Sequence, residues 1–163
     1  MAKKNKKISS SNLIKVKPIT EGQKSVFETW KQGKNQFLFG CAGTGKTFVS
    51  LYLAMQDVLN LQTKYEKVVL VRSLIPTREI GFLPGDEEDK AALYQVPYQN
   101  MVQFMFEQPN EQAFKMLYDR LKSQGSLYFL STSFLRGLTF DNTIIIVDEC
   151  QNLNFHELDT ITT

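Results

Sequence analysis

The stretch that decides the fold is Gly40-Cys41-Ala42-Gly43-Thr44-Gly45-Lys46-Thr47. It satisfies the spacing G-x-x-x-x-G-K-[ST], and it lies between a short apolar run at 36–39 and a segment with apolar residues at helical spacing, 46–60. Glycines at these positions let successive backbone N–H groups curl around phosphate oxygens, and the start of a helix adds positive potential. The sequence therefore predicts a phosphate-binding loop between a strand at 36–39 and a helix at 46–60.

Two side chains of this loop have expected roles of their own. Lys46 is expected to reach the β- and γ-phosphates, and the Thr47 hydroxyl to ligate magnesium. The alternative, a plain glycine turn before a helix, does not account for the strand-then-helix context. The predicted nucleotide-binding residues are Gly40, Cys41, Ala42, Gly43, Thr44, Gly45, Lys46, Thr47 and Phe48. Cys41 is either a passive spacer or a thiol whose oxidation blocks binding.

A second candidate element is an apolar run that ends in two acids. Residues 144–147 are Ile-Ile-Ile-Val, and Asp148 and Glu149 follow them directly. In α/β sheets the carboxyl ends of the strands are where ligands bind. Asp148 is expected to hold magnesium, usually through water, and Glu149 to polarise the water that attacks the γ-phosphate. The alternative for Glu149 is a supporting acid outside the chemistry.

Gln23 lies upstream of the loop and is the candidate for base recognition. A glutamine amide offers a donor and an acceptor, which match the N6 and N7 edge of adenine. Such a contact would make the nucleotide ATP. The alternative is an ordinary solvated residue on a helix.

The rest of the chain alternates in element type. Helices are predicted at 20–31, 46–60, about 91–106 and 111–122, strands at 36–39, 67–71, 127–130 and 143–147, and a loop at 74–90. The strands are apolar on both faces, as in a parallel sheet covered by helices. The predicted fold is α/β, a three-layer P-loop fold with a mostly parallel sheet. Four aromatic residues of the 91–106 helix are candidates either for stacking bases or for the helix core: Tyr94, Tyr98, Phe104 and Phe106.

Charge divides the chain into two parts. Six lysines and no acid precede Pro18, whereas 13 basic and 17 acidic residues follow, so that the net charge of +2 becomes about −4 for the remainder. Residues 1–17 are therefore expected to form a basic, disordered tail, and residues 18–163 the folded domain. Contact of the tail with nucleic acid is the alternative.

Several classes of protein are excluded by composition. Two cysteines, Cys41 and Cys150, and a single histidine, His156, provide neither a disulfide framework nor a zinc site. No apolar run approaches the roughly 18 residues that cross a bilayer, and the N-terminus lacks the apolar stretch of a secretory signal. We therefore expect no membrane partner and a cytoplasmic location, in the host cytoplasm if the gene belongs to a phage.

From Pro18 to Thr163 the chain resembles the ATPase core of the PhoH family, particularly the forms carried by bacteriophages, which are related to the RecA-like ATPase domains of superfamily-one helicases. Four matches carry the resemblance: the Gln23 segment, the glycine-rich loop, Gly81-Phe82-Leu83-Pro84-Gly85-Asp86 with Lys90 after it, and Phe134-Leu135-Arg136-Gly137 leading to Asp148-Glu149-Cys150-Gln151-Asn152. Cys150 stands where the family usually has alanine, and residues 91–98 match less well.

The resemblance implies the activity and further roles. It implies ATP and Mg²⁺ as ligands, adenine recognition by Gln23, and coupling of ATP turnover to RNA or single-stranded DNA. It makes Gln151 a sensor of the γ-phosphate, which joins Lys46 and Glu149 as a candidate catalytic residue. It also makes Arg72 the start of a surface that faces nucleic acid. The alternative for Arg72 and Arg136 is a structural pairing near the sheet.

The family's core continues beyond the segment that Thr163 ends. It includes a further strand, expected between the loop strand and the acid-bearing strand, and an arginine that stabilises the transition state. The sequence is therefore expected to be a fragment or an interrupted gene product, with weak binding and slow turnover. A P-loop kinase and a non-catalytic nucleotide-dependent module remain alternatives, and an oligomer is left open.

Overall fold

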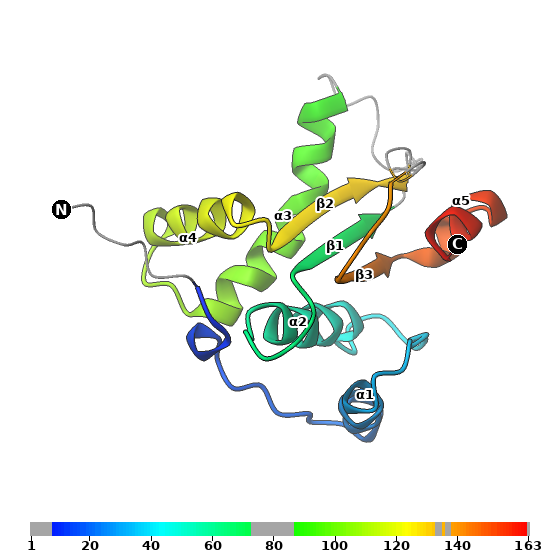
Figure 1. Ribbon diagram of the computed structural model, residues 1–163, viewed down its shortest axis with the longest axis horizontal. Helices are drawn as coiled ribbons and strands as arrows, with labels where there is room; N and C mark the ends of the chain where they lie inside the picture. The colour runs from blue at the N-terminus through cyan, green and yellow to red at the C-terminus, as the bar shows by residue number, and fades with distance from the viewer. Residues whose placement is uncertain (1–7, 73–86, 133–134, 136–137, 163) are drawn as a thin grey trace.

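The computed structural model describes residues 8–72, 87–132, 135 and 138–162, and for residues 87–93 and 162 the backbone alone. Figure 1 shows helices packed around a small central sheet. In chain order the elements are η1 (Ser10–Asn12), α1 (Glu21–Lys31), α2 (Lys46–Val58), β1 (Lys67–Arg72), α3 (Glu87–Phe106), α4 (Glu111–Ser123), β2 (Leu127–Ser131), β3 (Thr143–Asp148), η3 (Cys150–Asn152) and α5 (Phe155–Thr162).

Within the described residues the sheet has three strands in the order β2-β1-β3, and both pairings are parallel. At one end of the central strand, Arg72 lies opposite Ser131 of β2 and Asp148 of β3. The four middle residues of β1 are buried on both faces, as predicted from their β-branched, apolar composition. The carboxyl ends of the three strands therefore meet at one edge.

One face of the sheet packs against most of the helices. Val68 and Leu70 of β1 point to this face, where they join the larger core cluster. The cluster also contains Leu51 and Met55 of α2, and further buried residues from α3 and α4: Tyr98, Val102, Met105, Phe106, Tyr118 and Leu121. Helix α2 is thus anchored by its apolar face directly beside the sheet, which fixes where its N-terminus lies.

The opposite face carries a smaller cluster. Val69 and Val71 of β1 pack there with Leu135, and Ile161 of α5 lies against the same group. Alternate residues of one strand thus contact two different layers, as the period of two requires. The observed architecture is an α/β fold with helices on both faces of a parallel sheet, in agreement with the predicted class.

The predicted strand at 36–39 is wrong. These residues are all described and form no strand, and Phe37 and Phe39 are 76% and 87% exposed. A β-strand forms only where its backbone hydrogen-bonds to a neighbouring strand. Within the described residues, β3 pairs with β1 and does not pair with residues 36–39. Apolar composition alone supplied the prediction, and no strand in the described part of the chain pairs with this segment. Gln36 donates its side-chain N–H to the Val26 carbonyl of α1 instead, at 3.2 Å.

The predicted disordered tail at 1–17 is wrong for residues 8–17, whereas residues 1–7 lie outside the described part. Ile8 and Leu13 are buried in the larger core. The backbone of Ile14 donates to the Met105 carbonyl at 2.8 Å, and Ser10 donates to Leu59 at 3.0 Å. The lysines dominated the sequence pattern, but the apolar residues between them bury enough surface to order the segment.

Residues 87–90, predicted as loop, begin helix α3, and the rest of that loop lies outside the described residues. The other predicted helices and strands are present, with ends displaced by one to a few residues. Among the described helices, none is long and apolar enough to cross a bilayer.

Candidate functional site

The glycine-rich loop ends on a helix start that no side chain caps. Gly43 and Gly45 have φ of +77° and +80°, a region that L side chains rarely adopt. Gly45 is the N-cap of α2, and no side chain hydrogen-bonds to the first turn there. The N–H groups of that turn are therefore available to an anion, in the position where the helix dipole also favours one.

Lys46 lies over its own loop. Its ammonium donates to the carbonyls of Gly40 and Cys41, at 2.9 and 2.8 Å. An ammonium has three donors, so one remains for a phosphate oxygen. The Thr44 hydroxyl also donates to the Cys41 carbonyl, at 3.0 Å. These contacts hold the loop curled with the lysine charge at its centre. The Cys41 thiol is exposed.

Thr47 and Asp148 meet although 101 residues separate them in the chain. The Thr47 hydroxyl, on the first turn of α2, donates to Oδ1 of Asp148, at the carboxyl end of β3, at 3.0 Å. A hydroxyl and a carboxylate are oxygen ligands of the kind that Mg²⁺ takes, and Mg²⁺ commonly combines one or two carboxylates with substrate phosphates and water. The pair therefore fits the magnesium role predicted from the sequence. Among the described residues, no group of three acids, histidines or cysteines forms an alternative metal site.

Tyr98 completes the hydrogen bonding of Asp148. Its hydroxyl, from α3, donates to Oδ2 at 2.7 Å, and the side chain is 2% exposed. Burial, and next the Asp148 carboxylate, raise the pKa of Tyr98 far above its ordinary value, so the phenol keeps its proton. In the sequence, Tyr98 is only one of four candidate aromatic residues in its helix, because no pattern shows which turn of a helix will face an acid 50 residues away.

Glu149 follows Asp148 in a left-handed backbone conformation, with φ of +53°, and its side chain is exposed. This conformation is uncommon for a residue other than glycine, and it ends β3 abruptly and starts η3. The Gln151 side-chain amide donates to the Glu149 carboxylate. Glu149 and Gln151, two of the three candidate catalytic residues, therefore lie together just after Asp148.

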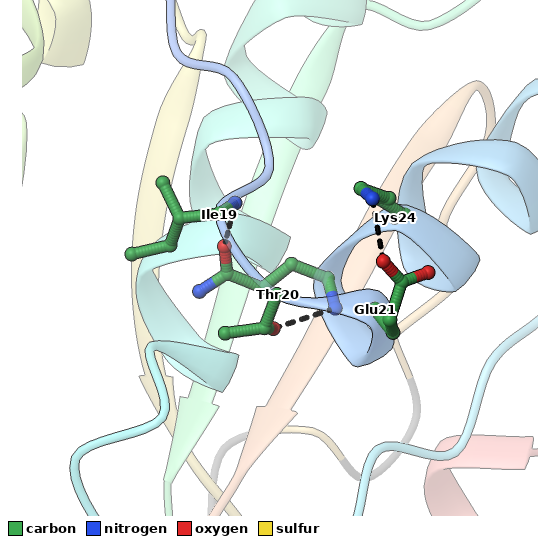
Figure 2. A network of polar contacts seen from close by, with 5 residues as sticks. Ile19, Thr20, Glu21 and Lys24 are labelled. Atoms are coloured by element: carbon green, nitrogen blue, oxygen red, sulfur yellow. Dashed lines mark hydrogen bonds and ion pairs between the residues drawn. The ribbon is translucent and has the colours of Figure 1, made fainter.

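Gln23 contacts the phosphate loop. Its Nε2 donates to the Thr44 carbonyl at 3.1 Å, and its Oε1 accepts from the Ile19 backbone at 2.9 Å. Figure 2 shows the start of α1, where Thr20 caps the helix and Lys24 pairs with Glu21. The amide thus links the helix start to the loop, and it keeps one N–H and one lone pair for a further partner.

The remaining candidates divide into three groups. The Arg72 guanidinium lies 5.5 Å from the centre of the Tyr94 ring, which is a structural contact. Phe48 packs edge-on against Phe104, with ring centres 5.8 Å apart, so its side chain joins α2 to α3. Arg136 and Gly81 to Asp86 lie outside the described residues, and so does the side chain of Lys90.

The glycine-rich loop lies at the start of α2, and Thr47 beside it contacts an acid at the end of the parallel strand β3. This arrangement defines a P-loop nucleotide-binding fold. The family model described as PhoH-like protein matches residues 15–163, and this chain belongs to that family.

Curated relatives agree with this assignment. Protein PhoH2 of Bacillus subtilis (strain 168) is 34% identical over 129 residues, which are 77% of this chain and 28% of the relative. A PhoH-like protein of Synechocystis is 32% identical over 128 residues, 78% of this chain and 36% of the relative. A PhoH-like protein of Mycobacterium leprae is 32% identical over 146 residues, which are 88% of this chain and 39% of the relative. The chain thus spans well under half the length of these relatives.

Proposed function

We propose that this chain binds ATP with Mg²⁺ and hydrolyses it. The observation that supports the proposal most strongly is the 3.0 Å contact between the Thr47 hydroxyl and the Asp148 carboxylate. It brings the phosphate loop and the acid-bearing strand to one point, which is the arrangement a magnesium-bound triphosphate requires. Neither motif alone predicts hydrolysis.

Each part of the loop has a task in this proposal. The N–H groups of the curled loop and of the first turn of α2 bind phosphate oxygens, and the free donor of Lys46 binds the β- and γ-phosphates. Thr47 and Asp148 hold the metal, Asp148 directly or through water. Bound magnesium supplies positive charge that neutralises the transferring phosphoryl group. Gln23 is proposed to recognise adenine with its remaining donor and acceptor, which makes the nucleotide ATP.

Glu149 is the proposed group that orients the attacking water. It is exposed at the end of β3, one residue beyond the metal-holding acid, and a carboxylate there can accept a proton or align a water. Gln151, which donates to Glu149, is proposed to sense the γ-phosphate by moving from the carboxylate to the phosphate. Because both groups lie beside Asp148, a nucleotide held by the loop would bring its γ-phosphate toward them.

We further propose, from the family relationship, that ATP turnover responds to RNA or single-stranded DNA. The curated relatives are bacterial, and the proposed place of action is the bacterial cytoplasm, including that of a phage host. Arg72 contributes less to a nucleic-acid surface than its sequence position indicated, because its guanidinium is stacked on Tyr94. The nucleic-acid contacts are therefore expected from other residues.

Phosphate release measured with and without single-stranded RNA or DNA tests both proposals. The matched variants are Lys46→Ala with the exposed Lys34→Ala as its control, and Glu149→Gln with the exposed Glu28→Gln as its control. Lys46→Ala is expected to abolish binding and release, whereas Glu149→Gln keeps ATP binding and lowers release by roughly 10²-fold or more. Undiminished release from Glu149→Gln would contradict the assigned water-orienting role, and release unaffected by either nucleic acid would contradict the coupling.

A second candidate, binding without turnover, is favoured by one contact. Gln151 donates to the Glu149 carboxylate, so that a water must displace or share that interaction before it can be activated. ATP affinity that depends on Lys46, together with no phosphate release above that of Lys46→Ala, would identify this candidate. A P-loop kinase, the third class, would form ADP only when an acceptor molecule is added, because the phosphoryl group is then transferred to the acceptor and not released as free phosphate.

A further inference from the structure

Both oxygens of the Asp148 carboxylate are hydrogen-bonded, and the donors come from two different helices. Oδ1 accepts from Thr47 on α2 at 3.0 Å, and Oδ2 accepts from Tyr98 on α3 at 2.7 Å. The carboxylate is thus held between the two helices, with its plane fixed by the two hydroxyl groups. A single donor would leave the group free to rotate about its terminal bond.

Helix α3 reaches this edge of the sheet at two points one turn apart. Tyr98 is buried, and its ring packs on Phe129 of β2 with centres 5.5 Å apart. Tyr94 lies under the Arg72 guanidinium. Arg72 is the β1 residue that stands directly opposite Asp148 in the sheet. The position of α3 and the orientation of Asp148 are therefore linked through Tyr98 and supported through Tyr94.

We propose that Tyr98 is a positioning residue for Asp148, and that it makes magnesium affinity depend on the placement of α3. The inference rests on the proposed function, because it concerns the same metal-bound nucleotide. The Tyr98 hydroxyl hydrogen-bonds to Oδ2 of Asp148, and Oδ1 faces Thr47. The metal is expected beside Oδ1 and the Thr47 hydroxyl. Thr47 and Asp148 would hold the magnesium, and the Tyr98 hydroxyl would keep the carboxylate oriented for it.

The size of the effect follows from known metal sites. Hydrogen bonds that orient a ligating carboxylate typically change metal affinity by roughly 10- to 100-fold. An O–H donor on a carboxylate is also stronger than a neutral pair, because the acceptor is ionised. The coupling is reciprocal: if α3 orders the metal ligand, then the bound metal stabilises α3.

The test compares Tyr98→Phe with the unaltered chain. This change keeps the ring against Phe129 and removes only the hydroxyl. A fluorescent ATP analogue is titrated at a series of magnesium concentrations. The analogue's affinity without magnesium is expected to stay unchanged, and the magnesium concentration at half-saturation to rise roughly 10- to 100-fold. The control is Tyr118→Phe, because Tyr118 is also buried but lies on α4 against Phe114, and it should change neither quantity.

Three outcomes contradict the inference. An unchanged magnesium requirement in Tyr98→Phe sinks it and leaves the proposed function standing. An equal loss of affinity with and without magnesium reduces Tyr98 to a residue that only stabilises the fold. A lack of any saturable signal in the unaltered chain removes the proposed function, and the inference with it.

A second measurement needs no variant and covers the case in which Tyr98→Phe fails to fold. Amide hydrogen exchange is followed in the unaltered chain with the ATP analogue, before and after magnesium is added. Exchange across residues 94–102 of α3 is expected to slow when the metal is added. Exchange there that does not respond to magnesium would overturn the coupling.

Discussion

At the residue scale, Gly45 is one of the loop positions whose backbone conformation favours glycine. It has φ of +80°, caps α2, and stands directly before Lys46. A Cβ added there would come to 3.4 Å from Nε2 of Gln23, which is an ordinary contact. The demand for glycine therefore comes from the left-handed backbone, which costs an L residue about 1–2 kcal/mol.

Gly45→Ala is accordingly expected to lower the free energy of unfolding by about 1–2 kcal/mol and to weaken ATP binding, because relief of the strain tilts the first turn of α2. Chemical denaturation and the ATP-analogue titration measure the two effects. Gly22→Ala is the matched control. Gly22 lies within α1 with ordinary backbone angles, and alanine should stabilise it by up to about 1 kcal/mol. If the Gly45→Ala chain were as stable as the Gly22→Ala chain, residue 45 would not require the left-handed backbone conformation.

At the scale of elements, one hydroxyl group makes two of the hydrogen bonds that hold the segment before α1 to α2. Tyr52 donates to the Ile14 carbonyl at 3.0 Å and accepts from the Val16 backbone at 3.2 Å, and it is buried. These two hydrogen bonds add to the burial of Ile8 and Leu13 in ordering a stretch that charge alone predicted to be disordered.

Tyr52→Phe should therefore lower the free energy of unfolding by about 1–3 kcal/mol, since it leaves two backbone groups without their partner. It should also speed amide exchange at residues 14–16. Tyr128→Phe, at an exposed tyrosine of β2, is the control and should change stability little. Equal stability of the two variants would show that the hydroxyl contributes nothing to holding this segment.

The second link between elements depends on pH. Glu157 of α5 accepts from the Thr132 hydroxyl, just after β2, at 2.6 Å, and from the Asn154 backbone at 2.9 Å. The hydrogen bond from Thr132, and then that from Asn154, lower the pKa of Glu157 below its ordinary value of 4.5. Because the folded pKa is the lower one, the stabilisation is present above pH 4.5 and is lost as pH falls through the folded value.

The Glu157→Gln variant is expected to lose less stability than the unaltered chain as the pH falls, because a glutamine side chain takes up no proton in this range. Amide exchange in α5, measured as pH is lowered from neutral to below 4.5, should rise in the unaltered chain and change less with pH in the variant. Glu111→Gln, at the start of α4, provides the comparison. Identical pH profiles for the unaltered chain and Glu157→Gln would contradict the linkage.

At the scale of the whole molecule, the site joins parts of the chain that are distant in sequence. The loop precedes α2, Asp148 ends β3, and Tyr98 belongs to α3. A ligand that contacts the first two holds the start of α2 to the acid-bearing edge of the sheet. Binding should therefore stabilise the fold as a unit rather than one segment.

Mg²⁺ with ATP at about 100 times its Kd should add about 2.7 kcal/mol, which raises Tm by about 5–10 °C for a chain of this length. Differential scanning calorimetry measures the shift. The Lys46→Ala chain should show none, and the Lys34→Ala chain should shift like the unaltered one. A similar shift in all three chains would indicate binding away from the loop.

Much of the fold was predictable from the sequence, because phosphate chemistry demands particular residues at fixed spacing. The loop, the acid pair and the parallel strands followed from such local patterns. The hydrogen bond between Thr47 and Asp148 agrees with the magnesium role that the sequence predicted for both residues. The wrong or incomplete predictions concern residues whose structure depends on contacts with segments that are distant in the sequence. The apolar residues at 36–39 needed a neighbouring strand, and the role of Tyr98 depends on which turn of α3 faces β3.

In the proposed function, the loop around Lys46 and the Asp148 carboxylate together bind a magnesium-bound triphosphate. The most direct test is a titration of the unaltered chain, Lys46→Ala and Lys34→Ala with a fluorescent ATP analogue in the presence of magnesium. We predict a saturable signal in the unaltered chain and in Lys34→Ala, and none in Lys46→Ala. Saturation that persists in Lys46→Ala, or its absence from all three chains, would contradict the claim.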